Sequence, residues 1–280
     1  MKQKMARLVL KRIIQYTLLA LVAIIMFFPI YWVISSSFKT VIGISHFPPE
    51  FFPKNPQFSN YLQVFLKAPI LIYARNTLLL MIGTTTGTLI SSAIVAYPLA
   101  RMNFKGKNVI FAIILATMMV PSTTTLIPQY MLFSKIGWID SMLPMIVPAF
   151  FAYPYNVFLL RQFYRGIPKS LDEAAAIDGC SRLGILIRII IPLSKPAFIT
   201  IGVLSCVFWW NELLTPLIYI DSNNLKPLTT GALATFQQGF IINWNYTMAM
   251  CVIMIIPPII GFLFANKYLI AGIKTTGMKG

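Results

Sequence analysis

The chain has 280 residues, of which 58% are hydrophobic and 11% are charged, and its formal net charge is +16. A soluble domain carries about 25% charged residues, so this composition excludes an ordinary soluble domain and predicts a membrane protein. A nucleic-acid-binding protein is not indicated, because the basic residues lie between apolar runs and form no solvated basic face. The cysteines (Cys180, Cys206 and Cys251) and the single histidine, His46, give neither a disulfide framework nor a multi-histidine metal site.

Six stretches are apolar enough to cross a bilayer, a crossing that needs about 20 residues. In chain order they are residues 13–38, 76–100, 108–134, 141–160, 197–220 and 246–266. The first run is too long for a signal-peptide core, and no small-residue cleavage site follows it, so we expect it to be retained. The sequence therefore predicts an all-α polytopic membrane protein with six transmembrane helices, organised as a single permease domain over residues 1–280.

The basic residues set the predicted orientation of these spans. Seventeen Lys and Arg lie in the terminal segments and the loops on their side, and six lie in the other set of loops. Because cytoplasmic loops carry the excess of Lys and Arg, we expect both termini and the loop 166–196 to be cytoplasmic. The segments 39–75, 135–140 and 221–245 then face outside. We expect segment 39–75, with its run Phe47-Pro-Pro-Glu-Phe-Phe-Pro53, to be extended and turn-rich rather than folded.

Proline recurs inside the predicted spans. Each proline removes a backbone donor and can kink a helix, and the freed carbonyl must find another partner in lipid. Kinked helices suit a bundle that lines a cavity, although proline is also commoner in membrane helices in general. The prolines concerned are Pro29, Pro98, Pro121, Pro128, Pro148, Pro154, Pro216, Pro257 and Pro258.

The loop 166–196 has the signals of a short helix followed by a second one. Ser170 and Glu173 are spaced as a capping box, and Gly179 is placed to end the helix in the left-handed conformation. A helix of about two turns is unstable alone in water and needs a partner surface. A second helix is expected from Ser181 to Ile191, with Leu183, Ile187 and Ile190 on its apolar side and Pro192 as its stop. The alternative is an amphipathic linker lying on the membrane surface.

The run Glu173-Ala-Ala-Ala-Ile-Asp-Gly179, followed by Ile191-Pro-Leu193, resembles the EAA motif of ABC importer permeases. The likeness extends over nearly the whole chain and is closest to the carbohydrate, MalG-like branch of that family. It is carried further by Phe28-Pro-Ile-Tyr-Trp32, Asn60-Tyr61, Ala96-Tyr-Pro-Leu-Ala-Arg101, Ile127-Pro-Gln-Tyr130, Trp210-Asn-Glu-Leu213 and the glycine-rich tail 271–280.

The resemblance implies a subunit of a bacterial cytoplasmic-membrane importer. Its implied partners are a MalF-like second permease subunit, two cytosolic ABC ATPase subunits, an extracytoplasmic solute-binding protein and membrane lipids. The chain has no phosphate-loop motif, and none of its seven carboxylates is arranged to hold Mg²⁺, so we expect no enzyme activity and no bound cofactor, with ATP and Mg²⁺ used by the ATPase. The implied ATPase-coupling residues are Ser170, Asp172, Glu173, Ala174, Ala175, Ala176, Asp178 and Gly179.

Glu212 is the one acidic residue inside a predicted span, and an intramembrane ionisable group indicates function by default. Because sugars bind planar polar side chains and aromatic faces, the solute pathway is predicted at Trp209, Trp210, Asn211 and Glu212, with Gln129 and Asn156 as weaker candidates. Alternatively, Asn211 and Glu212 only stabilise the helix bundle. The resemblance to the maltose system places most sugar contacts on the other subunit.

Three other functions compete with sugar import. A permease for glycerol-phosphate or another small solute resembles the same family, but an anionic solute favours Arg or Lys in the spans, and the predicted spans contain none. A secondary transporter needs intramembrane charge pairs or internal repeats, which the sequence does not show. A membrane enzyme needs a catalytic cluster, which one histidine and scattered acids do not provide.

Overall fold

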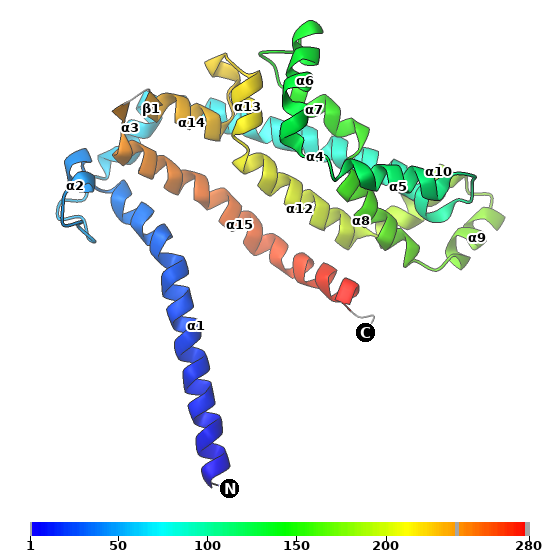
Figure 1. The fold of residues 1–280 in the computed structure, drawn as a ribbon, viewed down its shortest axis with the longest axis horizontal. Coiled ribbons are helices and arrows are strands. Elements are labelled where there is room, and N and C mark those ends of the chain that lie inside the picture. The colour runs from blue at the N-terminus through cyan, green and yellow to red at the C-terminus, as the bar shows by residue number, and fades with distance from the viewer. Residues whose placement is uncertain (1, 239–240, 278–280) are drawn as a thin grey trace. The chain divides into compact units, whose positions relative to one another are not determined.

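A computed structural model describes the backbone of residues 2–238 and 241–277 and the side chains of residues 9–237 and 242–263 (Figure 1). The contacts within the chain divide it into two compact units. Unit 1 comprises Met1–Pro69 and Ala232–Ile256, and unit 2 comprises Ile70–Gly231 and Pro257–Gly280. The single permease domain over residues 1–280 stays a prediction. The glycine-rich tail 271–280 lies outside the residues whose side chains are described.

The described chain is helical almost throughout, which confirms the all-α prediction, and its one β-ladder pairs two residues with two. Segments labelled η are 3-10 helices, except η2, which is a π-helix. The elements are α1 (Lys2–Ser37), α2 (Val41–Ser45), α3 (Ser59–Lys67), α4 (Ile70–Arg101), α5 (Lys107–Thr117), α6 (Ser122–Lys135), α7 (Leu143–Ile146), η1 (Val147–Phe151), α8 (Pro154–Arg165), α9 (Ser170–Ile177), α10 (Arg182–Ile185), η2 (Leu186–Ile190), α11 (Ile191–Leu193), α12 (Lys195–Asn211), α13 (Leu214–Tyr219), η3 (Asn223–Leu225), α14 (Leu228–Phe236), β1 (Gln237–Gln238), β2 (Ile241–Ile242) and α15 (Trp244–Gly277).

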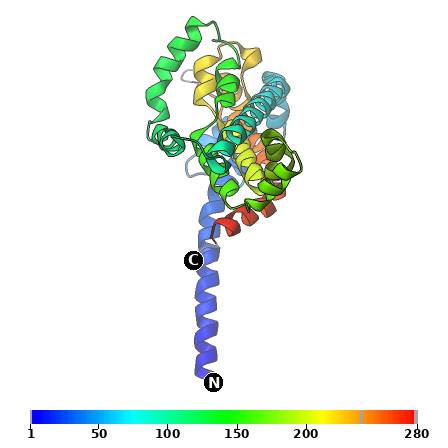
Figure 2. The ribbon, with the colours of Figure 1, turned by 90° about the vertical axis from the view of Figure 1, so that its right-hand side faces the viewer.

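By length and composition, four helical segments of the described chain can cross a membrane: Val9–Ser37, Ile70–Arg101, Leu143–Arg165 and Trp244–Leu263. Two further pairs of helices are apolar enough together but bent, so the number rises to six if each pair is one span. Five of the six predicted stretches are therefore found as apolar helical segments, whereas the second bent pair, Arg182–Leu193 with Lys195–Asn211, begins before the predicted fifth span 197–220 and ends before Glu212. Figure 2 shows the first of them, α1, as one unbroken helix through Pro29.

The third predicted span is bent at Pro121, one of the prolines expected to kink a helix. α5 and α6 meet at 92°, where the sequence predicts a single helix over 108–134. Pro121 has an extended backbone with φ −62° and ψ 133°, and it provides no N–H to continue α5. Proline also disfavours the helical conformation of the residue before it, so α5 ends in a short turn and α6 starts in a new direction.

Unit 2 is organised around α4, which packs against α8, η1 and α12. Small residues at four-residue spacing on α4 receive large side chains of α7 and η1: the space beside Gly83 is filled by Ile146, and that beside Gly87 by Phe150. One turn on, the hydroxyl of Ser91 donates to the carbonyl of Ala149 at 3.0 Å and accepts from the N–H of Ala152 at 3.1 Å. Small residues allow such close helix packing in membranes.

A second cluster of unit 2 joins the segments before α7 and after α13. Asp140 accepts hydrogen bonds on Oδ1 from the backbone N–H groups of Asp221, at 3.1 Å, and Ser222, at 2.8 Å. The Ser222 hydroxyl donates to Oδ2. Because these three donors surround an exposed carboxylate, they lower the pKa of Asp140 below its ordinary value of 3.8.

Unit 1 contains more regular structure between residues 39 and 75 than the sequence predicts. The extended-segment prediction is wrong in part, because α3 spans Ser59–Lys67 within it. Asn60 in α3 is buried, and its amide donates to the carbonyls of Ser37 and Lys39, both at 2.9 Å. A buried amide that satisfies two carbonyls at a helix end fixes α3 against the end of α1. This long-range pairing leaves no periodic signal in the sequence.

Lys39 is buried beside the same helix end. Its ammonium lies 4.2 Å from the centroid of the Trp32 ring and donates to the carbonyl of Glu50. Burial lowers the pKa of Lys39, and the charge of Glu50 partly offsets that effect. The ammonium group of Lys39, two residues after the end of α1, is thus held by the Trp32 ring and the Glu50 carbonyl.

Candidate functional site

The short helix predicted in the loop 166–196 is present as α9, Ser170–Ile177. The predicted capping box is wrong. Lys169 occupies the N-cap in a helical conformation and makes no side-chain capping bond, and its carbonyl accepts from the N–H groups of Asp172 and Glu173 at 3.0 and 3.1 Å. Ser170 is therefore already the first helical residue, one position too late to cap the helix. Asp172 and Glu173 still lie in the first turn, where the helix dipole favours anions.

Arg101, at the end of α4, fixes α9 in place. Its guanidinium donates to both carboxylate oxygens of Asp172, with Nε–Oδ2 at 2.7 Å and Nη2–Oδ1 at 2.9 Å. It also donates to three carbonyls just before α9: Tyr164 at 3.1 Å, Ile167 at 2.6 Å and Pro168 at 3.0 Å. One guanidinium therefore fixes the end of α8, the turn and the start of α9. From the sequence, Arg101 is predicted only to be a cytoplasmic basic residue and part of the family motif Ala96-Tyr-Pro-Leu-Ala-Arg101.

The three alanines of α9, all of them implied ATPase-coupling residues, do not face the same way. Ala175 is 8% exposed and belongs to the apolar core of unit 2, together with Tyr97, Ile185 and Ile190. Ala174 and Ala176 are exposed, as are Asp178 and Glu173. Ile177 is 87% exposed, so a large apolar side chain projects from the end of the helix. The outward face of α9 therefore consists of the exposed Glu173, Ala174, Ala176 and Ile177, with Asp178 exposed at its C-cap.

The end of α9 follows the prediction. Gly179 has φ +77°, in the left-handed region, and nothing lies within 4 Å of the position of a Cβ. The N–H of Cys180 donates to the carbonyl of Ala175 at 2.9 Å, and that of Gly179 to Ala176 at 3.1 Å. These bonds satisfy the last carbonyls of α9. Ser181 then caps α10, because its hydroxyl accepts from the N–H of Gly184 at 3.1 Å.

The second helix of the loop departs from prediction in its register and its end. The segment η2 is a π-helical turn, which inserts an extra residue and rotates the side chains that follow. Ile185, Leu186 and Ile190 are buried, whereas Leu183, which precedes η2, and Ile187, which lies within it, are exposed although both belong to the predicted apolar side. Pro192 does not stop the helix, because it lies in the first turn of α11, where its missing N–H is tolerated. The break comes at Ser194, with a bend of 78° into α12.

Glu212 interrupts the fifth predicted span. It has an extended backbone between α12 and α13, and its Oε1 accepts from both the N–H of Thr215, at 2.9 Å, and the Thr215 hydroxyl, at 2.6 Å. The carboxylate thus satisfies an orphan donor at the start of α13. This geometry supports the alternative in which Glu212 only stabilises the helix bundle.

The other predicted pathway residues are divided between core and surface. Trp209 is buried in an apolar cluster with Leu80, Phe133 and Tyr219, and Trp210 is also buried. Asn211 is exposed, and its amide donates to the carbonyl of Val207 in its own helix at 2.8 Å. Gln129 is exposed on α6, and Asn156 is half-buried on α8. Among the described residues, neither hydrogen-bonds to the segment 209–212, so the structure does not assemble the six into one site.

The apolar helical segments extend beyond the predicted spans and include basic residues, such as Arg75 and Arg101 in the second segment, Ile70–Arg101. The fourth apolar segment extends to Arg165, so it contains the buried Arg161. The Nε of Arg161 donates to the carbonyl of Leu99 at 3.0 Å, and the guanidinium lies 3.7 Å from the centroid of the Phe111 ring.

These features define a polytopic α-helical membrane protein with a structured loop between its fourth and fifth apolar segments. The chain belongs to the family described as binding-protein-dependent transport system inner membrane component, which matches residues 88–275. This result confirms the predicted ABC importer permease family and a multi-pass membrane location.

The relatives extend the likeness to nearly the full chain. It is 38% identical over 229 residues, 81% of each chain, to the arabinooligosaccharides transport system permease protein AraQ of Bacillus subtilis. It is 32% identical to the melibiose/raffinose/stachyose import permease protein MelC of Bacillus subtilis, over 94% of this chain and 95% of that one. It is 31% identical to the trehalose/maltose transport system permease protein MalG of Thermococcus litoralis, over 97% and 98%. The predicted carbohydrate branch is thereby confirmed.

The fold matches a solved structure of the same class. A crystal structure of a bacterial ABC transporter involved in the import of the acidic polysaccharide alginate matches with a TM-score of 0.82 and 25% identity, covering 92% of this chain and 95% of that chain. The same fold recurs, with a TM-score of 0.66 and 15% identity, in a bacterial alginate ABC transporter in complex with an alginate pentasaccharide-bound periplasmic protein.

Proposed function

We propose that this chain is the MalG-like permease subunit of an ABC importer for a neutral sugar or oligosaccharide. The observation that carries the proposal is the set of sugar-transport permeases to which the chain is similar over most of both lengths. The proposed complex adds a MalF-like permease, two cytosolic ABC ATPase subunits and an extracytoplasmic solute-binding protein. The chain itself binds no ATP or Mg²⁺ and catalyses no reaction. It lies in the bacterial cytoplasmic membrane, in contact with lipid.

In this proposal, α9 transmits ATP-driven movement from the ATPase to the spans. Its inner side is tied to α4 through Arg101 and to the core through Ala175. Its outer side offers Ile177 for burial in a partner. A helix held on one side by a two-oxygen ion pair moves together with α4, so force applied at Ile177 reaches the span. Ser170, Glu173, Ala176 and Gly179 shape this helix and its ends.

The solute pathway is proposed near the break between α12 and α13. There Asn211 is exposed and Glu212 is half-buried, whereas the buried Trp209 and Trp210 support them from the core. Gln129 and Asn156 remain weaker pathway candidates. A neutral solute is favoured because neither Arg nor Lys is among the proposed pathway residues. The competing candidate is an anionic solute, either glycerol-phosphate or an acidic saccharide such as that imported by the alginate transporter.

Uptake by whole cells tests the function. A host without its own sugar importers is given this chain with its second permease, ATPase and binding protein, and radiolabelled solutes are offered one at a time. The expected result is uptake of a neutral oligosaccharide that depends on the ATPase gene. Uptake of glycerol-phosphate or alginate fragments alone overturns the neutral assignment. Uptake that follows an ion gradient without the ATPase supports a secondary transporter instead.

The proposed orientation has its own test. Single cysteines replace Lys54 or Asn223, proposed to face outside, and Lys105 or Asp178, proposed to be cytoplasmic, in a variant without Cys180, Cys206 and Cys251. An impermeant thiol reagent applied to intact cells is expected to label the first two positions only. Labelling at position 105 from outside reverses the orientation.

A further inference from the structure

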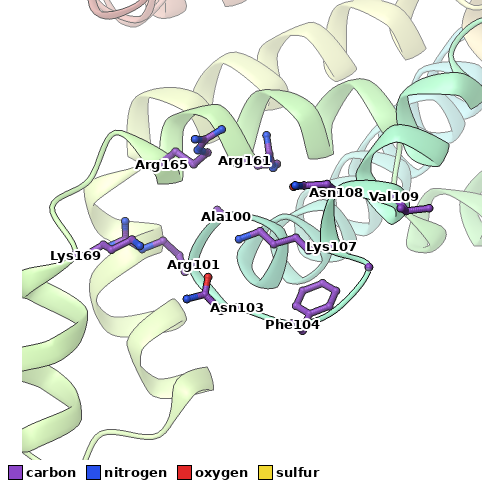
Figure 3. Close-up of a pocket in the computed structure, with 11 residues that line it drawn as sticks. Ala100, Arg101, Asn103, Phe104, Lys107, Asn108, Val109, Arg161, Arg165 and Lys169 are labelled. Atoms are coloured by element: carbon purple, nitrogen blue, oxygen red, sulfur yellow. The ribbon is translucent and has the colours of Figure 1, made fainter.

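Unit 2 contains a basic pocket of about 790 Å³ between the end of α4, the start of α5 and the end of α8 (Figure 3). Figure 3 shows Arg161 and Arg165 projecting from α8, with Lys107 on the facing segment. Arg101 and Lys169 complete the basic lining. We call this the α4–α8 pocket. It is separate from the outward face of α9 and from the predicted solute residues.

The positive charge in this pocket is not neutralised by the chain. No carboxylate is among the lining residues. Arg101 is paired with Asp172, but Arg161 and Lys107 have only uncharged partners: Leu99 and Phe111 for the former, and the Met102 carbonyl at 2.7 Å for the latter. Together with Arg165 and Lys169, four cations therefore face one cavity. Like charges gathered at a low-dielectric wall create a positive potential that concentrates anions.

The start of α5 adds to this potential. Gly106, Lys107, Asn108 and Val109 line the pocket. Gly106 is the N-cap with φ +82° and provides no side-chain capping bond, so the first-turn N–H groups of this 11-residue helix lack a side-chain acceptor. The N-terminus of a helix favours an anion.

The pocket is also bordered by an apolar surface, which selects among anions. Val109 lines the pocket and is 63% exposed, and Ile113, one turn further along α5, is 59% exposed. Residues four apart lie on the same face of a helix. Phe104 adds an exposed aromatic ring at the loop. A ligand whose charged end fills the pocket and whose apolar end follows α5 satisfies both features, whereas free phosphate satisfies only the first.

We propose that the α4–α8 pocket binds the phosphate headgroup of an anionic phospholipid, with an acyl chain lying along Val109 and Ile113. Basic pockets between membrane helices are suited to anionic headgroups, and each basic residue near the surface contributes to that attraction. The site is independent of which solute the protein carries. Lipid binding in the α4–α8 pocket makes the position of the loop before α9 depend on the lipid composition of the membrane.

Native mass spectrometry of the purified complex tests the proposal. The full chain, with the subunits that co-purify with it, is titrated in detergent with dioleoylphosphatidylglycerol, with dioleoylphosphatidylcholine and with inorganic phosphate. The test variant is Lys107→Gln with Arg165→Gln. The matched control is Lys105→Gln with Arg188→Gln, which removes two exposed charges that do not line the pocket. Subunit composition is recorded in the same spectra.

The expected result is a phosphatidylglycerol adduct whose apparent Kd rises about 30-fold in the test variant and stays near wild type in the control. Equal loss in both variants overturns the proposal, because the attraction is then not specific to the pocket. Saturation by inorganic phosphate without preference for phosphatidylglycerol over phosphatidylcholine overturns the lipid assignment in favour of a free phosphate. Loss of a protein subunit from the test variant with retained lipid assigns the pocket to protein docking instead.

Discussion

Arg101 at the end of α4 and Asp172 in the first turn of α9 form a two-oxygen ion pair, with N–O distances of 2.7 and 2.9 Å. They are 71 residues apart in sequence. The Arg101 side chain is 2% exposed and that of Asp172 is 19% exposed, so the pair is only weakly screened by solvent. The pair makes the position of α9 dependent on the end of α4.

Arg101→Ala is expected to destabilise the protein by about 3 kcal/mol, because it leaves the carboxylate and three carbonyls without their donor. Asp172→Asn is expected to cost less, since the guanidinium keeps the carbonyls of Tyr164, Ile167 and Pro168. Thermal unfolding in detergent measures both, and a double-mutant cycle isolates the pair. Effects that add within about 0.5 kcal/mol show that the two residues do not interact.

The exposed Ile177 is expected to be the docking residue of α9. Ile177→Glu places a charge in a desolvated contact and is expected to weaken ATPase binding by a factor of about 10 to 100, as for an interface hot spot. Because Ile177 is 87% exposed, unfolding of the isolated chain should not change. The matched control is Ile42→Glu in α2, an isoleucine that is 80% exposed.

Co-purification of the ATPase with each variant, quantified against wild type, measures this effect. Ala175→Glu is a second comparison. Because Ala175 lies in the core, its substitution should lower the thermal stability of the chain itself, unlike Ile177→Glu. Retention of the ATPase by Ile177→Glu at wild-type stoichiometry, with normal uptake, shows that α9 is not the docking site.

The positions of the spans could be predicted because each needs only about 20 apolar residues, a property of composition. The side of each helix that is buried could not be predicted from the sequence. The sequence places Leu183, Ile187 and Ile190 on one side of a helix, but which side is buried also depends on the contacts that the fold makes. The observed helix contains the π-helical turn η2, and both Leu183 and Ile187 are exposed.

The candidate site shows the same division between local and long-range signals. The left-handed Gly179 was predictable because its conformation depends on the residue itself. The inward direction of Ala175 and the role of Arg101 were not, since both depend on contacts with segments distant in sequence. The spacing of Ser170 and Glu173 was a true capping pattern that the fold did not use, because Lys169 already holds a helical conformation.

Gly179 offers a test of backbone conformation without a change in packing. Gly179→Val is expected to cost about 1 to 2 kcal/mol from the left-handed conformation alone, because no atom lies near the added Cβ. Gly179→Asn should recover most of the loss, since asparagine tolerates this conformation. Thermal unfolding of the two variants is compared. Equal destabilisation by Val and Asn contradicts the conformational explanation.

Glu212 separates the pathway role from the capping role. Glu212→Gln keeps an Oε1 acceptor for Thr215, so assembly and stability should stay near wild type while uptake rate or sugar preference changes. Glu212→Ala removes the acceptor and is expected to cost about 1 kcal/mol, as for a lost helix cap. Uptake and unfolding are measured on the same preparations. A glutamine variant with wild-type uptake and preference assigns Glu212 to capping alone.

The contacts of Asp140 predict how stability depends on pH. Because the pKa of Asp140 is lowered by the Ser222 hydroxyl and by the N–H groups of Ser222 and Asp221, its contribution to stability is fully present above the ordinary value of 3.8. That contribution is lost as the pH falls through the lower pKa of the folded protein. Asp140→Asn is the suitable variant, since residue 140 has φ +58°, which asparagine tolerates.

The thermal midpoint of wild type should therefore exceed that of Asp140→Asn at neutral pH, and the difference should shrink as the pH is lowered below 3.8. Ser222→Ala removes the hydroxyl donor and should reduce the same pH-dependent difference in part, because the two N–H groups remain. A difference between wild type and Asp140→Asn that is constant from neutral to acid pH shows that the carboxylate charge does not contribute. The lower stability of Asp140→Asn is then explained by the shape of its side chain and by the number of hydrogen bonds that it accepts.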